Sequence, residues 1–187
     1  MQNIGRDAAG TCCFLGQSFE KFFEGQGENN SAYMSLLIKI VLEIESKMDK
    51  GCDTFLTPLC CNAEIWFAEA VLDLRRAYPD KHLRLISILP AKEDCSAGPA
   101  SRRAQHIVPL SDEVVTLDIS RAADYMQTCV GYMLAHAGHL IVVRDERNAG
   151  AHAVAEEACK KGLETTVITS KGDRKDTITV RHLTILH

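Results

Sequence analysis

The chain contains the stretch Leu83-Arg-Leu-Ile-Ser-Ile-Leu89, which is nearly continuous in large aliphatic side chains and is followed at once by Pro90. A short apolar run of this kind is typical of a strand that is covered on both faces. A strand with one face in water would alternate apolar and polar residues instead. The stretch therefore predicts an inner strand of a parallel sheet, and Pro90 is expected to stop it.

Segments of the same kind recur on both sides of this stretch and are separated by helical patterns. Further strands are predicted at 11–15, 53–57, 113–117, 140–143 and 165–169, and helices at 31–50, 62–78, 102–107, 121–137 and 150–161. Such alternation with short linkers favours parallel pairing, right-handed crossovers and helices on both faces of the sheet. We therefore predict an α/β fold of three layers, Rossmann-like, with a mostly parallel sheet.

The length of 187 residues fits one domain, 1–187, because domains typically run to roughly 100–200 residues. The polar segment 1–10 is expected to be disordered. Segment 177–187 alternates β-branched residues and is expected to add an edge strand. The hydrophobic share of 46% and the charged share of 25% are those of an ordinary globular protein.

Charge and cysteine content narrow the range of partners. The net charge of -4 gives no field that would attract nucleic acid, and no apolar run is long enough to cross a membrane. The N-terminus lacks the apolar run of a secretion signal, and the eight cysteines sit mainly in apolar stretches. We therefore expect a cytoplasmic protein with reduced thiols that binds neither membranes nor nucleic acid.

In an open parallel sheet, ligands bind in the crevice at the carboxyl ends of the strands, where helix N-termini favour anions. In this chain that edge follows Leu15, Thr57, Leu89 and Val143. The predicted fold therefore places a ligand, if one binds, among these four loops.

Three stretches from different parts of the chain share a pattern. They are Thr11-Cys-Cys-Phe-Leu-Gly-Gln-Ser18, Gly51-Cys-Asp-Thr-Phe-Leu-Thr-Pro-Leu-Cys-Cys-Asn-Ala-Glu-Ile-Trp-Phe-Ala-Glu69, and the segment from Tyr132-Met133 through Leu140-Ile-Val-Val143 to Ala149-Gly150-Ala151. Together they resemble the YpsA-like branch of the SLOG superfamily, a Rossmann-like group that includes the lysine-decarboxylase-like phosphoribohydrolases and the DNA-processing protein DprA. The resemblance implies a nucleotide-related ligand and covers most of the chain.

The polar site residues are where the chain departs from this family. Positions that keep the pattern are Gly16, Trp66, Ala68, Glu69, Met133 and Gly150. Exchanged positions are Gln17 and Ser18 for His and Arg, Pro58 and Asn62 for glycines, Glu64 for Asp, Cys129 and Val130 for Arg and Asn, Gly138 for Asp, and Ala149 and Ala151 for the first and last residues of Gly-Gly-Thr. The resemblance therefore implies a retained fold with a rewritten site.

The resemblance and the predicted crevice together give a set of candidate ligand-binding residues. They are Gly16, Gln17, Ser18, Pro58, Asn62, Glu64, Arg144, Gly150 and Ala151. No catalytic residue is assigned, no metal is expected and the cofactor is unknown.

Each candidate also has a simpler interpretation. Glu64, like Glu69, either binds a ribose hydroxyl or a water, or only complements the dipole of the predicted helix at 62–78. Gln17 and Ser18 are neutral donors in the crevice or parts of an ordinary turn. Arg144, with Asp145 and Arg147, grips a phosphate or is a solvated loop residue.

His152 and the cysteines are further alternatives. His152 begins a predicted helix and is either an acid–base group or an exposed cap. Cys12 and Cys13 lie in the first predicted strand, and Cys60 and Cys61 follow the end of the second. Adjacent parallel strands would bring the two pairs near each other, which would suit a metal or redox site. Alternation sends adjacent side chains to opposite faces, and no Cys-x-x-Cys spacing completes a tetrahedral set, which argues against that site.

Three functions remain open. The leading hypothesis is a non-catalytic or ligand-sensing domain that binds or senses a nucleotide-related small molecule through a degenerate site. An enzyme that splits the N-glycosidic bond of a nucleoside monophosphate is the alternative. The third is an interaction domain without a ligand that forms a homodimer.

Overall fold

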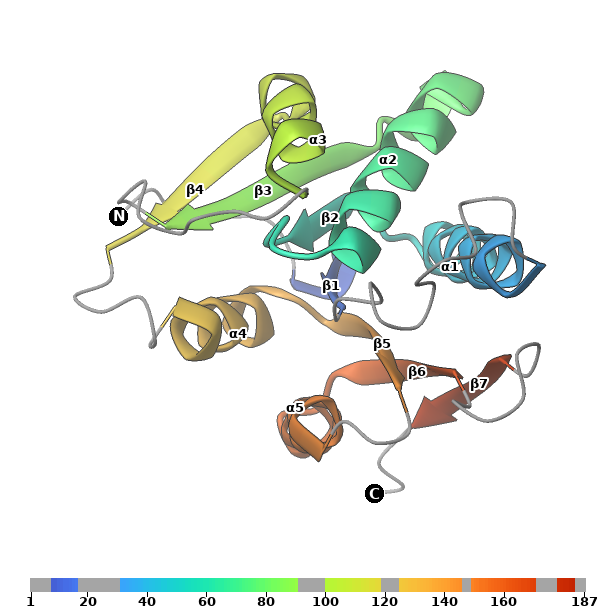
Figure 1. The fold of residues 1–187 in the computed structure, drawn as a ribbon, viewed down its shortest axis with the longest axis vertical. Coiled ribbons are helices and arrows are strands. Elements are labelled where there is room, and N and C mark those ends of the chain that lie inside the picture. The colour runs from blue at the N-terminus through green and yellow to red at the C-terminus, as the bar shows by residue number, and fades with distance from the viewer. Residues whose placement is uncertain are drawn as a thin grey trace.

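The computed structural model describes residues 8–16, 31–90, 100–118, 125–145, 149–170 and 178–183. Within these ranges one sheet holds seven strands in the order β4-β3-β2-β1-β5-β6-β7 (Figure 1). All neighbouring strands are parallel except β6 and β7, which are antiparallel. The predicted Rossmann-like α/β fold with a mostly parallel sheet is therefore confirmed.

The strands are β1 (Thr11–Leu15), β2 (Thr54–Thr57), β3 (Arg84–Pro90), β4 (Glu113–Leu117), β5 (His139–Asp145), β6 (Glu164–Ser170) and β7 (Ile178–Leu183). The helices are α1 (Ser31–Asp49), α2 (Asn62–Ala77), α3 (Ala100–Ile107), α4 (Tyr125–His136) and α5 (Ala149–Lys160). Short 3-10 turns occupy Ala8–Gly10, Pro79–Lys81 and Val108–Leu110. Of the segment 1–10 that was expected to be disordered, residues 1–7 lie outside the described ranges.

Helices cover both faces of the sheet. One core lies under α1, α2 and α3, where the ring of Phe14 stacks on that of Phe67 with centroids 4.3 Å apart. A second core lies under α4 and α5 and contains Leu15, Val142 and Met133. Successive residues of β1 and β5 belong to opposite cores, because side chains alternate along a strand. The three layers predicted from the alternation of elements are thus present.

The predicted ends of β3 and β5 were wrong. The β3 strand includes Pro90, which pairs with Leu117 at the last position of the ladder, where a missing N–H is tolerated. The β5 strand is longer than predicted: Arg144 pairs with Thr169, and Asp145 pairs with Ser170. Arg144 therefore lies in a strand rather than in the loop that follows it. Polar side chains at the end of a strand conceal its boundary from a pattern of apolar residues.

The direction of chain growth reverses at β1. From β1 the chain adds β2, β3 and β4 on one side, and then returns to place β5, β6 and β7 on the other. In open α/β sheets such a switch point leaves a crevice outside the carboxyl ends of the two central strands. Here these strands are β1 and β5, so the crevice is expected beyond Leu15 and beside α5, the helix that follows β5.

A buried lysine, Lys47, lies at the amino ends of the parallel strands. The Nζ of Lys47 lies 2.6 Å from Oε1 of Glu164, and the Lys47 side chain is 0% exposed. Lys50 contacts the same carboxylate oxygen from the surface. Burial alone would raise the pKa of Glu164, but these two ammonium groups lower it to about 2. These contacts connect α1 to β6 at the amino ends of the strands, whereas the crevice lies at their carboxyl ends.

No helix in the described part of the chain combines the length and the apolar character that a bilayer span requires.

Candidate functional site

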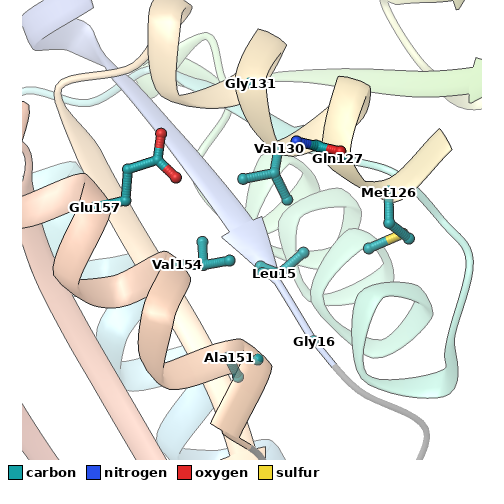
Figure 2. A pocket seen from close by; sticks show the side chains of 10 residues that line it. Leu15, Gly16, Met126, Gln127, Val130, Gly131, Ala151, Val154 and Glu157 are labelled. Atoms are coloured by element: carbon teal, nitrogen blue, oxygen red, sulfur yellow. The ribbon is translucent and has the colours of Figure 1, made fainter. Parts of the chain in front are cut away.

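A groove of about 620 Å³ opens at the switch point, between α4 and α5. Its floor is the carboxyl end of β1 (Figure 2). The lining residues are Leu15, Gly16, Met126, Gln127, Val130, Gly131, Gly150, Ala151, Val154 and Glu157. Volumes of roughly 300–1,000 Å³ are usual for small-molecule sites. The groove thus has the size and the place in the fold that a ligand site requires.

The groove has two chemically different ends. Figure 2 shows Ala151 and Gly16 at one end, near the start of α5, and Glu157 at the other, across from Gly131 of α4. Between them the walls are aliphatic, formed by Val130 and Val154. The start of a helix carries a positive partial charge, and Glu157 is the one charged residue among the described lining residues. The groove is therefore polarised along its length.

Beside the groove, Glu64 connects the ends of β1 and β2. Its Oε1 accepts a hydrogen bond from the backbone N–H of Gly16 at 3.3 Å. Its Oε2 accepts two more, from the N–H of Cys60 at 2.7 Å and of Cys61 at 3.1 Å. Glu64 is 1% exposed. Both carboxylate oxygens therefore serve backbone donors of the protein itself.

Burial has the largest effect on the pKa of Glu64. Removal from water raises the pKa of its carboxyl group to about 7, although the hydrogen bonds from Cys60, Gly16 and Cys61 work in the opposite direction. A buried carboxylate that keeps three hydrogen bonds is satisfied without an external partner. The arrangement resembles the carboxylate half of a capping box, in which a residue at the third helical position accepts from the N-cap N–H.

Gly16 is required by close packing. A Cβ at this position would lie 2.6 Å from the Cβ of Ala63 and 3.2 Å from the Sγ of Cys61. The end of β1 thus packs closely against the start of α2, and the hydrogen bonds of Glu64 hold the two segments together. This side of the crevice is filled by protein atoms, and the described opening lies on the other side, toward α4 and α5.

The β2–α2 loop also approaches α4. The hydroxyl of Tyr125 donates to the carbonyl oxygen of Ile88 at 2.9 Å. Burial, with the nearby Cys60 thiol, raises the pKa of Tyr125. Burial likewise raises the pKa of Cys129, and the nearby Cys60 and Glu64 raise it further. These groups therefore stay protonated near neutral pH, so Cys129 is a thiol rather than a reactive thiolate.

The candidate residues from the sequence separate into groups. Gly16, Gly150 and Ala151 line the groove. Pro58 is buried in the β2–α2 loop and Asn62 begins α2, so both lie beside Glu64 rather than among the lining residues. Gln17 and Ser18 lie outside the described residues.

Arg144 and His152 have different surroundings from those expected. Arg144 is half-buried at the end of β5, and its Nε is buried with no hydrogen-bond partner among the described residues. His152 is 57% exposed, and its Nε2 lies 3.1 Å from Glu156 on the next turn of α5. Neither residue is among those lining the groove.

The cysteine pairs occupy different surroundings. Cys12 and Cys13 belong to opposite cores of the sheet, as alternation requires. Burial raises the pKa of both thiols, that of Cys13 to about 12. In the described ranges, no three histidine, cysteine or acidic side chains gather in a way that could hold a metal ion.

The residues that the sequence analysis missed as site residues lie mainly on α4 and α5. They are Leu15, Met126, Gln127, Val130, Gly131, Val154 and Glu157; Val130 had been noted only for its departure from the family pattern. One signal was present: α4 has no Asp, Glu, Lys or Arg in its 12 residues and carries a glycine in its middle. A surface helix usually has a charged face, so an uncharged one indicates a covered or ligand-facing surface.

Comparison with known proteins gave no assignment. No family model matches the chain, and no curated protein matches it.

Proposed function

We propose that this protein binds or senses a nucleotide-related small molecule in the groove between α4 and α5. The observation that carries the proposal is the position of a groove of about 620 Å³ at the switch point of the sheet. Open α/β sheets hold their ligands there, and apolar walls with a few polar groups are the usual chemistry of small-molecule sites. The polarity between the start of α5 and Glu157 suits a ligand with unlike ends.

Binding without catalysis is the form of this proposal that the geometry favours. Glu64, the residue that would orient water in a hydrolytic relative, uses both oxygens for backbone N–H groups. Glycoside cleavage by an acid–base mechanism commonly uses two carboxyl groups that flank the bond. Among the described lining residues Glu157 is the one carboxylate, so the groove offers only half of such a pair.

The family to which the chain belongs is a further part of this proposal. We regard the chain as a divergent, YpsA-like member of the SLOG superfamily, because of the three stretches described above. The exchange of a family aspartate position for Glu64 fits this view, since the longer side chain reaches the N–H of Gly16. A site rewritten in this way would explain why the phosphate-gripping pattern is missing.

A thermal-shift panel tests the proposed binding. Nucleosides, nucleoside monophosphates, ADP-ribose and nicotinamide cofactors at millimolar concentration should include at least one compound that raises the melting temperature. The Val154→Trp variant, which fills the groove, should lose that shift. Ala135→Trp is the matched control, because Ala135 is exposed on α4 and is not a lining residue. A panel in which no compound stabilises the wild-type protein would overturn the proposal.

A homodimer in the cytoplasm is the proposed setting. Helix α1 exposes Met34, Ile38 and Leu42 by 48%, 54% and 55% of their surface. Their four-residue spacing makes an apolar stripe, which a second copy would cover through the same patch across a two-fold axis. Light scattering coupled to gel filtration should give twice the chain mass, and Ile38→Glu should give the monomer. A wild-type monomer at micromolar concentration would refute the dimer.

A further inference from the structure

We infer, building on the proposed binding function, that the ligand carries a planar base with an exocyclic amino group. The base lies flat against the backbone of α4 at Gly131 and directs its amino group to the carboxylate of Glu157. The sugar end points toward the start of α5. Three features of the groove support this orientation.

Gly131 is a glycine that packing does not require. It lies inside α4, where glycine costs about 1 kcal/mol relative to alanine. A Cβ at this position would have no atom within 4 Å of the described residues, so no neighbour forbids a side chain. Gly131 nevertheless lines the groove. Its absent side chain leaves a flat surface of helix backbone, and a flat surface suits a planar ring.

Glu157 supplies the polar contact at the same end. Figure 2 shows its carboxylate directed from α5 into the space between α5 and α4, across the groove from Gly131. An ionised carboxylate only accepts hydrogen bonds, so it selects a ligand atom that donates. Its present partner is Lys161, at 3.0 Å from Oε1, and both side chains are about half exposed. An exposed pair of this type contributes little, so Glu157 can exchange this contact for a ligand.

The opposite end of the groove suits the remainder of the ligand. Gly150 and Ala151 form the first turn of α5, where the helix dipole favours oxygen atoms with negative charge. Aliphatic side chains, Val130 and Val154, lie between the two ends. The groove therefore offers an acceptor, an apolar slot and a positive helix end in that order. An amino-substituted base attached to a sugar presents a donor, a flat apolar ring and oxygen atoms in the same order.

Two pairs of nucleosides isolate the amino group. Adenosine differs from purine riboside only by that group, and guanosine differs from inosine in the same way. Calorimetric titration of the wild-type protein should show at least one amino-bearing member binding about tenfold more tightly than its partner, because a hydrogen bond to a charged group separates them. The preference should shrink to about twofold or less in Glu157→Leu, since the charged acceptor is gone.

Matched variants separate the groove from the rest of α5. Glu156→Leu changes the neighbouring residue, which pairs with His152 outside the groove, and should keep the tenfold preference. Gly131→Leu should abolish binding of both members of each pair, because the side chain occupies the flat surface. Circular dichroism of each variant establishes that it is folded.

The outcomes distinguish this inference from the function on which it rests. If no nucleoside or nucleotide binds the wild-type protein, the proposed function itself fails. If nucleosides bind without any preference in either pair, or if the preference survives in Glu157→Leu, the inference is wrong while the binding function stands. The wild-type comparison needs no variant, so a poorly folding mutant does not leave the inference undecided.

Discussion

The carboxylate of Glu64 and the backbone N–H of Gly16 share a hydrogen bond of 3.3 Å, although the residues are 48 positions apart. The same side chain binds the N–H groups of Cys60 and Cys61 at the start of α2. One buried acid thus joins the carboxyl end of β1 to the loop that follows β2. The groove floor at Gly16 is positioned by this contact, so the stability of the fold and the shape of the site are coupled.

Removal of the Glu64 side chain should destabilise the protein. Glu64→Ala removes a buried carboxylate and leaves three N–H groups without their acceptor, and we expect a loss of about 2–4 kcal/mol in the free energy of unfolding. Urea denaturation followed by circular dichroism measures the loss. Glu156→Ala is the control, because Glu156 is 54% exposed and pairs with the exposed His152 on the preceding turn, so its effect should stay within about 0.5 kcal/mol. Equal losses in the two variants would disprove the role of Glu64.

The titration of Glu64 predicts a pH dependence. Its pKa is about 7 in the folded protein against 4.5 for an exposed carboxyl, so the folded state holds the proton more tightly. The stability that comes from this group is complete below about pH 4.5 and is lost as the pH rises through 7, a change on the order of 3 kcal/mol. Above that pH both states are ionised and the effect is constant.

Glu64→Gln provides the comparison for this titration. The amide keeps the shape of the side chain but does not ionise, so the difference in unfolding free energy between wild type and variant should change between pH 4.5 and 7. Urea midpoints measured at half-unit steps of pH test this. A constant difference across that range would show that Glu64 does not titrate in it.

The sequence predicted the sheet well because strands buried on both faces are marked by their composition. The apolar segment at 11–15 coincides with β1, all of whose residues are buried. The boundaries of β5 were missed because Arg144 and Asp145 are polar but still pair with β6. Strand order was not predicted, since it depends on long-range pairing that no local pattern encodes.

The site was predicted only at the level of its place in the fold. Gly16, Gly150 and Ala151 were found because open parallel sheets bind ligands at strand ends and helix starts, and because these positions lie in the stretches that carry the family resemblance. The groove wall on α4 was missed, since Met126 and Gly131 carry no chemistry that marks a ligand contact by itself. The role of Glu64 was ambiguous in sequence because an acid at the start of a helix serves the helix dipole, the N-cap or a ligand equally well.

The ion pair between the buried Lys47 and the partly exposed Glu164 should respond differently to the loss of each partner. Glu164→Gln leaves the fully buried Lys47 ammonium without a counter-ion, and we expect a loss of about 3 kcal/mol. Lys47→Met replaces the buried charge by an apolar chain and leaves Glu164 with Lys50, so the loss should be about 1 kcal/mol or less. Guanidinium denaturation at pH 7 compares them, and a larger loss in Lys47→Met would contradict the argument.

The same pair predicts an acid dependence with the opposite sign to that of Glu64. The pKa of Glu164 is about 2 in the folded protein against 4.5 when exposed, so its stabilisation is present above about pH 4.5 and is lost as the pH falls toward 2. Denaturation curves of wild type and Glu164→Gln should therefore converge as the pH falls through this range. Curves that stay equally far apart at pH 2.5 and pH 6 would rule this out.

Two glycines that line the same groove should respond to alanine in opposite directions. At Gly16 the new Cβ would lie 2.6 Å from the Cβ of Ala63, and neither atom can turn away, so β1 or α2 must shift. We expect a loss of about 1–3 kcal/mol, as for an overpacked core. At Gly131 the new Cβ meets open space within α4, and the higher helix propensity of alanine should add up to about 1 kcal/mol. Thermal and urea unfolding of the two single variants decide the matter. Gly16→Ala also moves the groove floor, so it should weaken any ligand-induced rise in melting temperature. A Gly16→Ala protein as stable as the wild type would show that β1 and α2 are not in close contact.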